Sequence, residues 1–419
     1  MAIVDTTPPA TVPSTPTRSL GQHFGDYLGR LRGGELGSLP AVSGLVGLCV
    51  IFGVARPVFF SARNFANLFT QGAQVTVIAM GLVFVLLLGE IDLSAGFTSG
   101  VCAAVLAVLL TNWHWPWYFA VLVAIVAGVA IGTTLGTLVA KVRIPSFVVT
   151  LAAFLAFQGV VLLILKEGTN VSIADPVISA IENRNLPDWL SWTLLVAGVL
   201  GYLAVQVIRA RGRARRGLAF DPLALIAIRV GAVAVIGGFF VYVLNIERSQ
   251  NPLRVSLRGV PIVVPLIVVL LLVWTFVLSR TAYGRHIYAV GGSAEAARRA
   301  GINVDRIKVS AFVICSGMAA IAGIVAASRA NSVDPNTGGS NILLYAVGAA
   351  VIGGTSLFGG KGRVLDAVLG GAVVAVIDNG MGLMEYKSGV KYVVTGIVLL
   401  TAAGIDALSR RRAAASGLR

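Results

Sequence analysis

Long apolar runs separated by short polar segments recur along the whole chain. A helix needs about 20 predominantly apolar residues to cross a bilayer, and most of these runs approach that length. The pattern predicts an all-α polytopic membrane bundle of about 12 spanning helices. Their expected positions are 39–55, 73–88, 93–110, 117–140, 145–165, 190–208, 222–244, 262–278, 309–327, 342–357, 364–383 and 390–405.

Two of these expected spans, 73–88 and 342–357, are short and break at glycine-rich sequences. The first ends in Gly89-Glu-Ile-Asp-Leu-Ser-Ala-Gly96, and the second contains Gly348, Gly353 and Gly354 and ends in Gly359-Gly-Lys-Gly362. Matching short or glycine-broken segments in the two halves of a transporter point to the substrate path. The residues expected along this path are Gly89, Glu90, Asp92, Ser94, Thr150, Gln158, Gly353, Gly354 and Thr355.

Two carboxylates, Glu90 and Asp92, stand at the first break. A carboxylate at membrane depth is costly, so it is usually functional or faces water. Asp92 or Ser94 can instead cap the helix that starts near Leu93. A proton relay is a further possibility, but the other spans offer few ionisable partners, which are Arg229, Asp366 and Asp378.

A polar stretch from Arg280 to Lys308 separates two apolar runs. Within it, the sequence from Ser293 to Gly301 predicts a short helix. Ser293 is a suitable N-cap, and Glu295 falls in the first turn, where the helix dipole favours an acid. Arg298 and Arg299 fall in the last turn, and Gly301 ends the helix.

This short helix leaves a face of small residues, Ala296, Ala297 and Ala300. A short, basic helix with a small-residue face at a membrane edge suits docking into a groove on another protein. A solvated loop that only joins two spans fits the same spacing.

Composition agrees with a membrane protein, because 57% of the residues are hydrophobic and only 12% are charged. A soluble domain is nearer a quarter charged. Cys49, Cys102 and Cys315 each fall inside an apolar run and form no CxxC pair, so neither a disulfide framework nor a zinc site is predicted. The three histidines are scattered, and we expect no metal and no cofactor.

The net charge of +15 is explained by the orientation of the loops. With twelve spans, 22 of the Lys and Arg residues fall on the side of the two termini and 10 on the other side. This bias predicts that both termini and the stretch 280–308 are cytoplasmic. It requires no nucleic acid, and the basic run 209–216 is typical of a segment anchored on membrane lipid.

Three regions are expected along the chain. Residues 1–37 begin with a Thr- and Pro-rich segment and are predicted to be a disordered or surface segment. Residues 38–407 are predicted to form the transmembrane domain, including the cytoplasmic loop 280–308. Residues 408–419 are predicted to be a basic cytoplasmic tail.

The sequence from Gly354 to Gly362 superficially matches a phosphate-binding loop. The motif G-x-x-x-x-G-K-[ST] requires Gly at position 355 and Ser or Thr at position 362, where this chain has Thr355 and Gly362. No soluble domain of nucleotide-binding size is present either. We therefore expect no enzymatic activity, and any ATP used must be hydrolysed by another chain.

Four motifs in order resemble the permease subunits of ribose- and xylose-type sugar ABC importers, over about residues 60–412. They are Gly89-Glu-Ile-Asp-Leu-Ser-Ala-Gly96, Pro145-Ser-Phe-Val-Val-Thr-Leu151, the segment from Tyr288 to Asn303, and the segment from Val351 to Val364. The third motif contains E-A-A-x-x-x-G, which docks on the ATPase in such importers. The resemblance therefore implies an ATPase-coupling role for Ser293, Glu295, Ala296, Ala297, Arg298, Gly301 and Asn303.

The resemblance also implies an assembly in a bacterial plasma membrane. It contains two permease copies, two ATPase domains and one extracytoplasmic sugar-binding protein. This chain departs from the family at Leu343-Leu-Tyr345, where Glu-Leu-Asp is common. It also adds the helix pair 190–244, a length that resembles the xylose-type branch and favours a pentose.

Two rival functions belong to other classes. A proton-coupled secondary sugar transporter would act without an ATPase and would use Glu90 and Asp92 as its proton site. A passive channel is the second rival. Adjacent genes for a protein with a full nucleotide-binding motif and for a secreted binding protein would favour the importer.

Overall fold

The computed structural model describes residues 38–166, 169–217, 222–249, 251 and 256–415. Helices dominate this part of the chain, which confirms the predicted all-α membrane bundle. The expected N-terminal segment 1–37 lies outside the described residues. The chain divides into two compact units, and each is described by itself: Leu36–Pro187 with Leu244–Arg419, and a smaller unit that includes Asp188–Val243.

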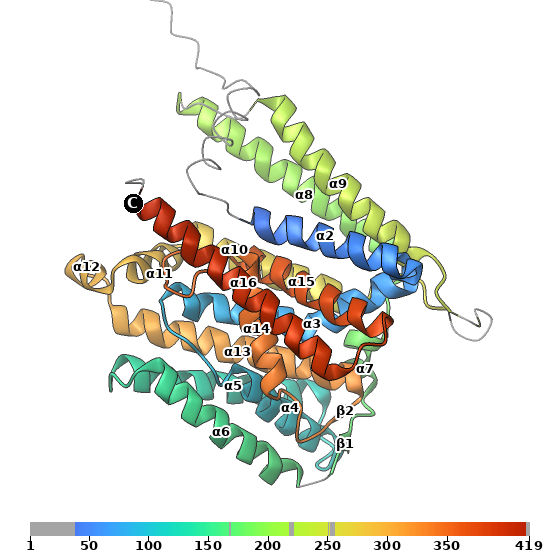
Figure 1. Cartoon of the computed structure of the whole chain (residues 1–419), viewed down its shortest axis with the longest axis horizontal. Coiled ribbons are helices and arrows are strands. Elements are labelled where there is room, and N and C mark those ends of the chain that lie inside the picture. Colours follow the sequence, from blue (N-terminus) through green and yellow to red (C-terminus); the bar gives the residue numbers. More distant parts are fainter. Residues whose placement is uncertain (1–37, 167–168, 218–221, 250, 252–255, 416–419) are drawn as a thin grey trace, which may run out of the picture. The chain divides into compact units, whose positions relative to one another are not determined.

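The larger unit is built from the helices labelled in Figure 1. They are α2 (Leu39–Ala55), η1 (Pro57–Phe60), α3 (Ala62–Leu87), α4 (Ala95–Thr111), α5 (Trp117–Ala140), α6 (Ser146–Leu165), α7 (Pro176–Asn183), α10 (Val263–Arg280), α11 (Ala282–Gly292), α12 (Ala294–Arg299), α13 (Val304–Ala330), α14 (Ser340–Gly353), α15 (Val364–Leu383) and α16 (Ser388–Ala415). Two short strands, β1 (Val171–Ser172) and β2 (Ser332–Val333), pair antiparallel with Val171 opposite Val333.

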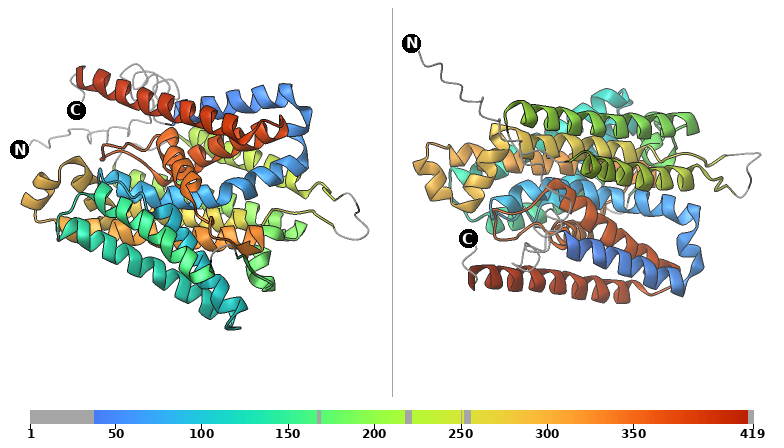
Figure 2. Two further views of the ribbon diagram at one scale, coloured as in Figure 1. Left: turned by 60° about the horizontal axis from the view of Figure 1, so that its bottom comes forward. Right: turned by 90° about the horizontal axis from the view of Figure 1, so that it is seen from above.

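Helix α3 lies at the centre of the larger unit. Its residues from Val75 to Leu87 are all buried, and they pack against α13, α15, α14 and α10. A helix that is apolar on every side is stable only when other helices surround it. Figures 1 and 2 show α3 enclosed in this way, with α2 packed along α15. The centre of the unit is therefore a protein interior and not a lipid-facing surface.

Helix α5 approaches α13 through a row of glycines. A side chain at Gly128, Gly132 or Gly136 would lie 2.7 Å, 2.5 Å and 2.8 Å, respectively, from the backbone of α13. Small residues spaced four apart let helix backbones approach closely within a membrane. The abundance of glycine thus has a packing reason at this interface.

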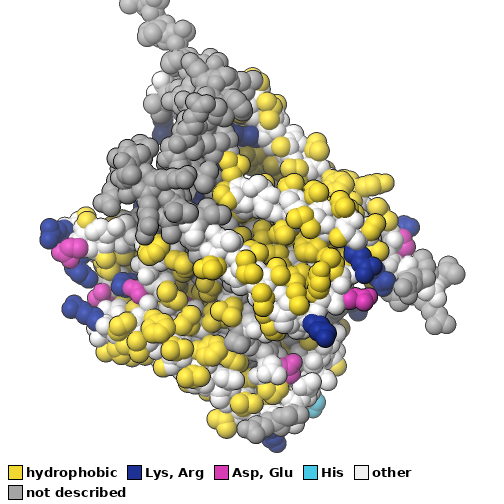
Figure 3. All heavy atoms as spheres, in the orientation of Figure 1, with side chains coloured by type: hydrophobic (Ala, Val, Ile, Leu, Met, Phe, Trp, Pro, Cys, Tyr) yellow, Lys and Arg dark blue, Asp and Glu magenta, His cyan; other side chains and the backbone are white. Residues whose placement is uncertain are grey.

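The outer surface of the unit is apolar along several helices. Exposed side chains include Leu122 on α5, Leu155 and Leu163 on α6, and Leu272 and Phe276 on α10. In Figure 3 hydrophobic side chains cover much of the middle of the larger unit, and charged side chains lie toward its edges. Such a surface is stable against lipid tails, since every backbone group within the helices is already hydrogen-bonded.

Eight helices within the described residues are long and apolar enough to cross a membrane, and four shorter apolar helices accompany them. Together they account for the expected spans. The bounds of 39–55, 117–140 and 364–383 are confirmed at both ends, and most other spans differ by a few residues.

One expectation about the helices was wrong. The first of the two spans expected to be short, 73–88, does not begin at residue 73, because α3 starts at Ala62 and has 26 residues. Polar residues in its first half find partners, since Asn64 donates to the carbonyl of Phe59 and Gln71 accepts from Asn379. Most of the basic run 209–216, whose anchoring on lipid stays a prediction, continues helix α8, which ends at Arg215. Helix α16 includes the first residues of the expected tail 408–419 and ends at Ala415.

The smaller unit is dominated by two helices, α8 (Asp188–Arg215) and α9 (Leu223–Asn245). The last two residues of α9 are assigned to the larger unit. Gly237 of α9 faces Leu195 of α8, because a side chain at Gly237 would lie 2.6 Å from Leu195 Cδ1. Both helices are mostly exposed, and α9 and the part of α8 before Arg209 are predominantly apolar, as suits segments surrounded by lipid. They correspond to the expected additional pair 190–244.

Figure 1 shows α12 at one end of the larger unit, and α7, β1 and β2 at the other; we call these the α12 end and the α7 end.

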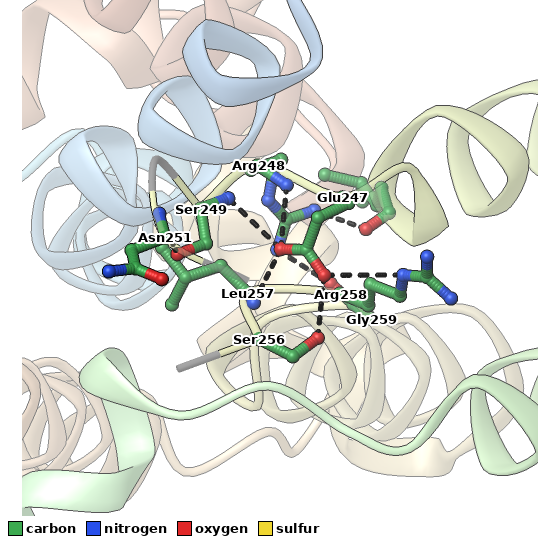
Figure 4. Close-up of polar contacts among 9 residues, drawn as sticks. Glu247, Arg248, Ser249, Asn251, Ser256, Leu257, Arg258 and Gly259 are labelled. Carbon is green, nitrogen blue, oxygen red and sulfur yellow. Dashed lines mark hydrogen bonds and ion pairs between the residues drawn. The ribbon is translucent and has the colours of Figure 1, made fainter. Parts of the chain in front are cut away.

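The loop after α9 is organised around one carboxylate (Figure 4). Glu247 accepts hydrogen bonds from the amides of Leu257, Ser249 and Arg248 and from the hydroxyl of Ser256, and it pairs with Arg258 at 3.3 Å. These bonds, chiefly those from Leu257 and Ser249, lower the pKa of Glu247 to about 2.

Candidate functional site

The first chain break joins α3 to α4 at the α12 end. Helix α3 ends at Leu87, and Gly89 takes a left-handed conformation with φ of 72° that favours glycine. The extended segment that follows lies against the start of α6. Ile91 donates its amide to Ser146 Oγ at 3.3 Å, and Thr150 donates its hydroxyl to the carbonyl of Ile91 at 3.2 Å. The predicted residue Thr150 is thus brought to this break.

Asp92 is buried at the start of α4. Its carboxylate accepts hydrogen bonds from the amide of Ser94 at 2.9 Å and from the hydroxyl of Ser94 at 2.6 Å. Ser94 occupies the N-cap position of α4, but its own side chain makes no capping hydrogen bond. The expected capping function is therefore carried by Asp92, which holds the chain in the turn just before Ala95. Asp92 thus has a structural role in starting α4.

Glu90 has a partner that sequence reasoning missed. Lys308 Nζ lies 2.5 Å from Glu90 Oε1, and the two side chains are 23% and 16% exposed. The pair joins the first break to α13, because Lys308 is in the first turns of that helix. The only sequence signal was a Lys one residue before the expected span 309–327.

A polar pocket of about 390 Å³ lies beside this ion pair. Its charged lining residues are Glu90, Arg143, Arg298, Asp305 and Lys308, and Ser146 and Ala294 also line it. The pocket therefore connects the first break, the α5–α6 loop and the short helix α12.

The second break follows α14. This helix has only 14 residues and ends at Gly353, and the next residue, Gly354, has φ of 118°, so the prediction of a short helix broken at glycine is confirmed. Gly353 packs on α15, where a side chain would lie 1.7 Å from the carbonyl of Asp366. Thr355 is 1% exposed and donates its amide to the carbonyl of Ala350 at 3.0 Å. These residues are held by backbone hydrogen bonds and by close packing against α15.

The polar stretch 280–308 contains two helices, α11 and α12. The helix predicted from Ser293 to Gly301 is confirmed as α12, with Ser293 Oγ accepting from the amide of Ala296 at 3.2 Å. Glu295 pairs with Arg298 at 3.5 Å and with Arg299 at 3.2 Å. Gly301 has φ of 81°, as expected for the residue that ends such a helix. Helix α11 was not predicted, because its polar side chains hide the apolar face formed by Ile287 and Val290.

One expectation about α12 was wrong. Ala297 does not share an outward face with Ala296 and Ala300, because it is only 4% exposed and packs into the core of the larger unit. Ala296 and Ala300 are exposed. Asn303 lies after α12 and caps α13, since its side chain accepts from the amide of Arg306 at 2.9 Å. The surface of α12 that a partner can reach therefore consists of Glu295, Ala296, Arg298, Arg299 and Ala300.

The predicted path residues do not all lie together. Glu90, Asp92, Ser94 and Thr150 meet at the first break, whereas Gln158 is exposed two turns further along α6. The two breaks are adjacent, since Gly360 donates its amide to the carbonyl of Leu87 at 2.8 Å. The packing of the helices thus brings the two breaks, about 270 residues apart in the sequence, into one cluster at the α12 end.

A bundle of this kind, with two glycine-broken segments beside a short exposed helix, has the features of a transport permease. The family model for "Branched-chain amino acid transport system / permease component" matches residues 64–403. The chain belongs to this family of permease components, and it is a multi-pass protein of the plasma membrane.

Individual relatives agree over most of the chain. The xylose transport system permease protein XylH of Escherichia coli (strain K12) is 40% identical over 358 residues, which cover 84% of this chain and 87% of that protein. The protein of the same name from Haemophilus influenzae is 34% identical and covers 88% of this chain and 96% of its own. The ribose import permease protein RbsC of Escherichia coli (strain K12) is 29% identical, and the match covers 86% of this chain and 91% of that protein. No solved structure matches.

These relatives confirm the resemblance that the four motifs indicated, to permeases of the ribose and xylose type. The higher identity to the xylose proteins agrees with the resemblance to the xylose-type branch.

Proposed function

We propose that this chain is the transmembrane permease subunit of an ATP-driven importer of a monosaccharide, with a pentose such as xylose as the substrate. The observation that carries the proposal is the 40% identity to xylose permeases across 84% of the chain. The 29% identity to ribose permeases supports the wider sugar class. Binding assays with the cognate sugar-binding protein would decide between xylose and ribose.

The ATPase subunit is proposed to dock on α12. This helix carries exposed Ala296 and Ala300, whose small side chains leave room for a partner surface, and exposed Arg298 and Arg299. Figures 1 and 2 show it beyond the neighbouring helices of its unit. A short helix with an exposed outer face, anchored on its inner face by the buried Ala297, is suited to follow the movement of a bound partner.

The remaining partners follow from the same assignment. Two copies of this chain are proposed to form the transport unit, because each chain has one E-A-A-x-x-x-G segment, from Glu295 to Gly301, and an importer has two ATPase domains. The sugar-binding protein would then act at the α7 end. With the 22-to-10 distribution of basic residues, the α12 end and both termini would face the cytoplasm.

The transport mechanism requires no covalent chemistry. Sugar would be handed over at the outer face and released inside when the ATPase cycle changes the relative stability of outward-open and inward-open states. A partner can shift such an equilibrium only through a difference in its affinity for the two states. The residues at the two breaks are proposed to set the geometry at the inner end of the path; they are Gly89, Glu90, Asp92, Ser94, Thr150, Gly353, Gly354 and Thr355. Gln158 is proposed to belong to the path two turns further along α6.

A proton-coupled transporter acting alone is not favoured. The relatives are permease proteins of transport systems, and Glu90 is engaged by Lys308 rather than by a second titratable acid. Asp92 is occupied in the turn that starts α4.

The test is uptake of radiolabelled xylose by proteoliposomes that contain this chain with its ATPase, together with the binding protein outside. We expect uptake only with internal ATP, and none with an ATPase whose nucleotide-binding lysine is replaced. Uptake should be unchanged when a protonophore collapses the proton gradient. Xylose accumulation that follows an imposed proton gradient in vesicles with this chain alone would overturn the importer assignment.

A further inference from the structure

Three backbone segments from distant parts of the chain meet at one point of the α12 end. They are the end of α3 at Leu87, the last turn of α11 at Gly291, and the loop after the second break at Gly359 and Gly360. Gly360 donates its amide to the carbonyl of Leu87 at 2.8 Å. We call this set of four residues the glycine junction.

Side chains are excluded from the glycine junction by the approach of the backbones. A β-carbon at Gly291 would lie 1.9 Å from the carbonyl oxygen of Leu87 and 2.9 Å from the amide nitrogen of Gly360. A β-carbon at Gly359 would lie 3.0 Å from the oxygen of Gly291 and 3.0 Å from the amide nitrogen of Gly89. Each of the three segments therefore touches the other two, with no flexible side chain between them.

A hydrogen bond beside the junction ties the same elements together. The hydroxyl of Tyr288 in α11 donates to the carbonyl of Gly362 at 2.7 Å. Gly362 belongs to the loop that follows the second break. Helix α11 thus holds this loop at two places, one turn apart.

Helix α11 is also joined directly to α12. Ser293 is at once the last cap of α11 and the N-cap of α12, so Gly291 lies only three residues from the first residue of α12. A displacement of α12 therefore reaches Gly291 through only two intervening residues, Gly292 and Ser293. Because the contacts at Gly291 are backbone to backbone, they cannot be absorbed by a change of rotamer.

We propose that the glycine junction transmits the displacement of α12 to both chain breaks at once, with Gly291 as its positioning residue. This inference rests on the proposed function, since it assigns the route by which a docked ATPase reaches the transport path. A contact to one break alone would shift that break independently of the other. Here Gly359 contacts both Gly89 and Gly291, so the two breaks are displaced together.

The decisive variant is Gly291→Ala, and the chain supplies its matched control one residue further on. Gly292→Ala makes the same change in the same helix, but a β-carbon at Gly292 meets nothing within 4 Å. Alanine is the better helix former at both positions, so intrinsic helix propensity favours both variants equally. The two differ only in the contact with Leu87 and Gly360.

The measurement is the ratio of xylose imported to ATP hydrolysed in proteoliposomes with the ATPase and the binding protein. We expect Gly291→Ala to retain the ATPase on co-purification and to hydrolyse ATP, with a ratio that falls about tenfold or more, as for loss of about 1.4 kcal/mol of coupling. Gly292→Ala should keep the wild-type ratio. A ratio within twofold of wild type for Gly291→Ala would overturn the proposal, and so would loss of the ATPase from this variant.

A second pair of variants tests the proposal independently, in case Gly291→Ala misfolds. Tyr288→Phe removes only the hydroxyl that bonds Gly362, and Tyr283→Phe removes a hydroxyl of the same helix that bonds Ser310 of α13 at 2.8 Å. We expect the ratio to fall about threefold to tenfold for Tyr288→Phe, as for the loss of one hydrogen bond, and to stay unchanged for Tyr283→Phe. Equal effects of the two variants would overturn the proposal. If the wild-type chain neither retains the ATPase nor imports xylose, the proposed function itself fails, independently of any variant.

Discussion

The ammonium group of Lys308 lies 2.5 Å from a carboxylate oxygen of Glu90, although 218 residues separate them along the chain. The pair fastens the first chain break to α13 beside the helix α12. Both side chains are less than a third exposed, so solvent screens the pair only in part. It is an ion pair between the break and the helix that follows α12.

Breaking this pair should destabilise the protein. Exposed pairs contribute about 0–1 kcal/mol, and removing one partner of a buried pair costs about 3–5 kcal/mol. For Lys308→Met we therefore expect a loss of roughly 1–3 kcal/mol in the free energy of unfolding, measured by denaturation in detergent. Exposed Lys141→Met is the control and should change little. An unchanged stability of Lys308→Met would show that the pair contributes nothing.

Asp92→Asn should retain most of the transport. The amide oxygen of asparagine can accept the same two hydrogen bonds from Ser94 while the charge is removed. Asp92→Ala should lose both bonds and about 0.5–2 kcal/mol of stability. The measurement is xylose uptake, with membrane insertion checked by immunoblotting. If Asp92→Asn inserts normally but abolishes uptake, the charge itself is required and the proton-coupled alternative gains support.

Bulk on the two sides of α12 should have different effects. Ala296→Trp adds bulk to an exposed position, so it should leave thermal stability unchanged but displace the ATPase. Ala297→Trp adds bulk to a position only 4% exposed, so it should cost about 1–3 kcal/mol of stability through overpacking. Co-purification of the ATPase and thermal unfolding separate the two effects. Full ATPase retention by Ala296→Trp would argue that α12 is only a connecting segment.

The orientation of the chain in the membrane can be tested by cysteine labelling in intact cells. Exposed Asn336 lies in the loop between β2 and α14, and exposed Ala214 lies near the end of α8. With the three native cysteines replaced, a membrane-impermeant maleimide should label Asn336→Cys and leave Ala214→Cys unlabelled. The reverse result would place both termini outside.

The loop around Glu247 should lose order only in strong acid. Its pKa is lowered from 4.5 to about 2, chiefly by the amides of Leu257 and Ser249. A carboxyl group with a lowered pKa stabilises the folded loop above about 4.5, and this contribution is lost as the pH falls through about 2. Hydrogen exchange of the Leu257 amide, corrected for intrinsic rates, should rise in this window. Glu247→Gln should exchange faster than wild type near neutral pH and lack the acid transition.

Much of the bundle was predictable because local signals coincide with its packing. Uninterrupted apolar runs with polar or proline boundaries set α5 and α15. The short helix α12 was found from its cap and its terminal glycine, which act within a few residues. The two breaks were visible as glycines within apolar sequence.

The sequence by itself therefore determined the fold class, most spans, the helix α12 and, with its four motifs, the family. Only the tertiary structure decided that α3 reaches back to Ala62, because its polar first half is satisfied by partners such as Asn379, far along the chain. It also decided that Ala297 points inward and that Lys308 pairs with Glu90. The contact of Leu87, Gly291 and Gly359 could not be predicted, because glycine has no side chain whose pattern reveals its neighbours, and its partners are set by how whole helices pack.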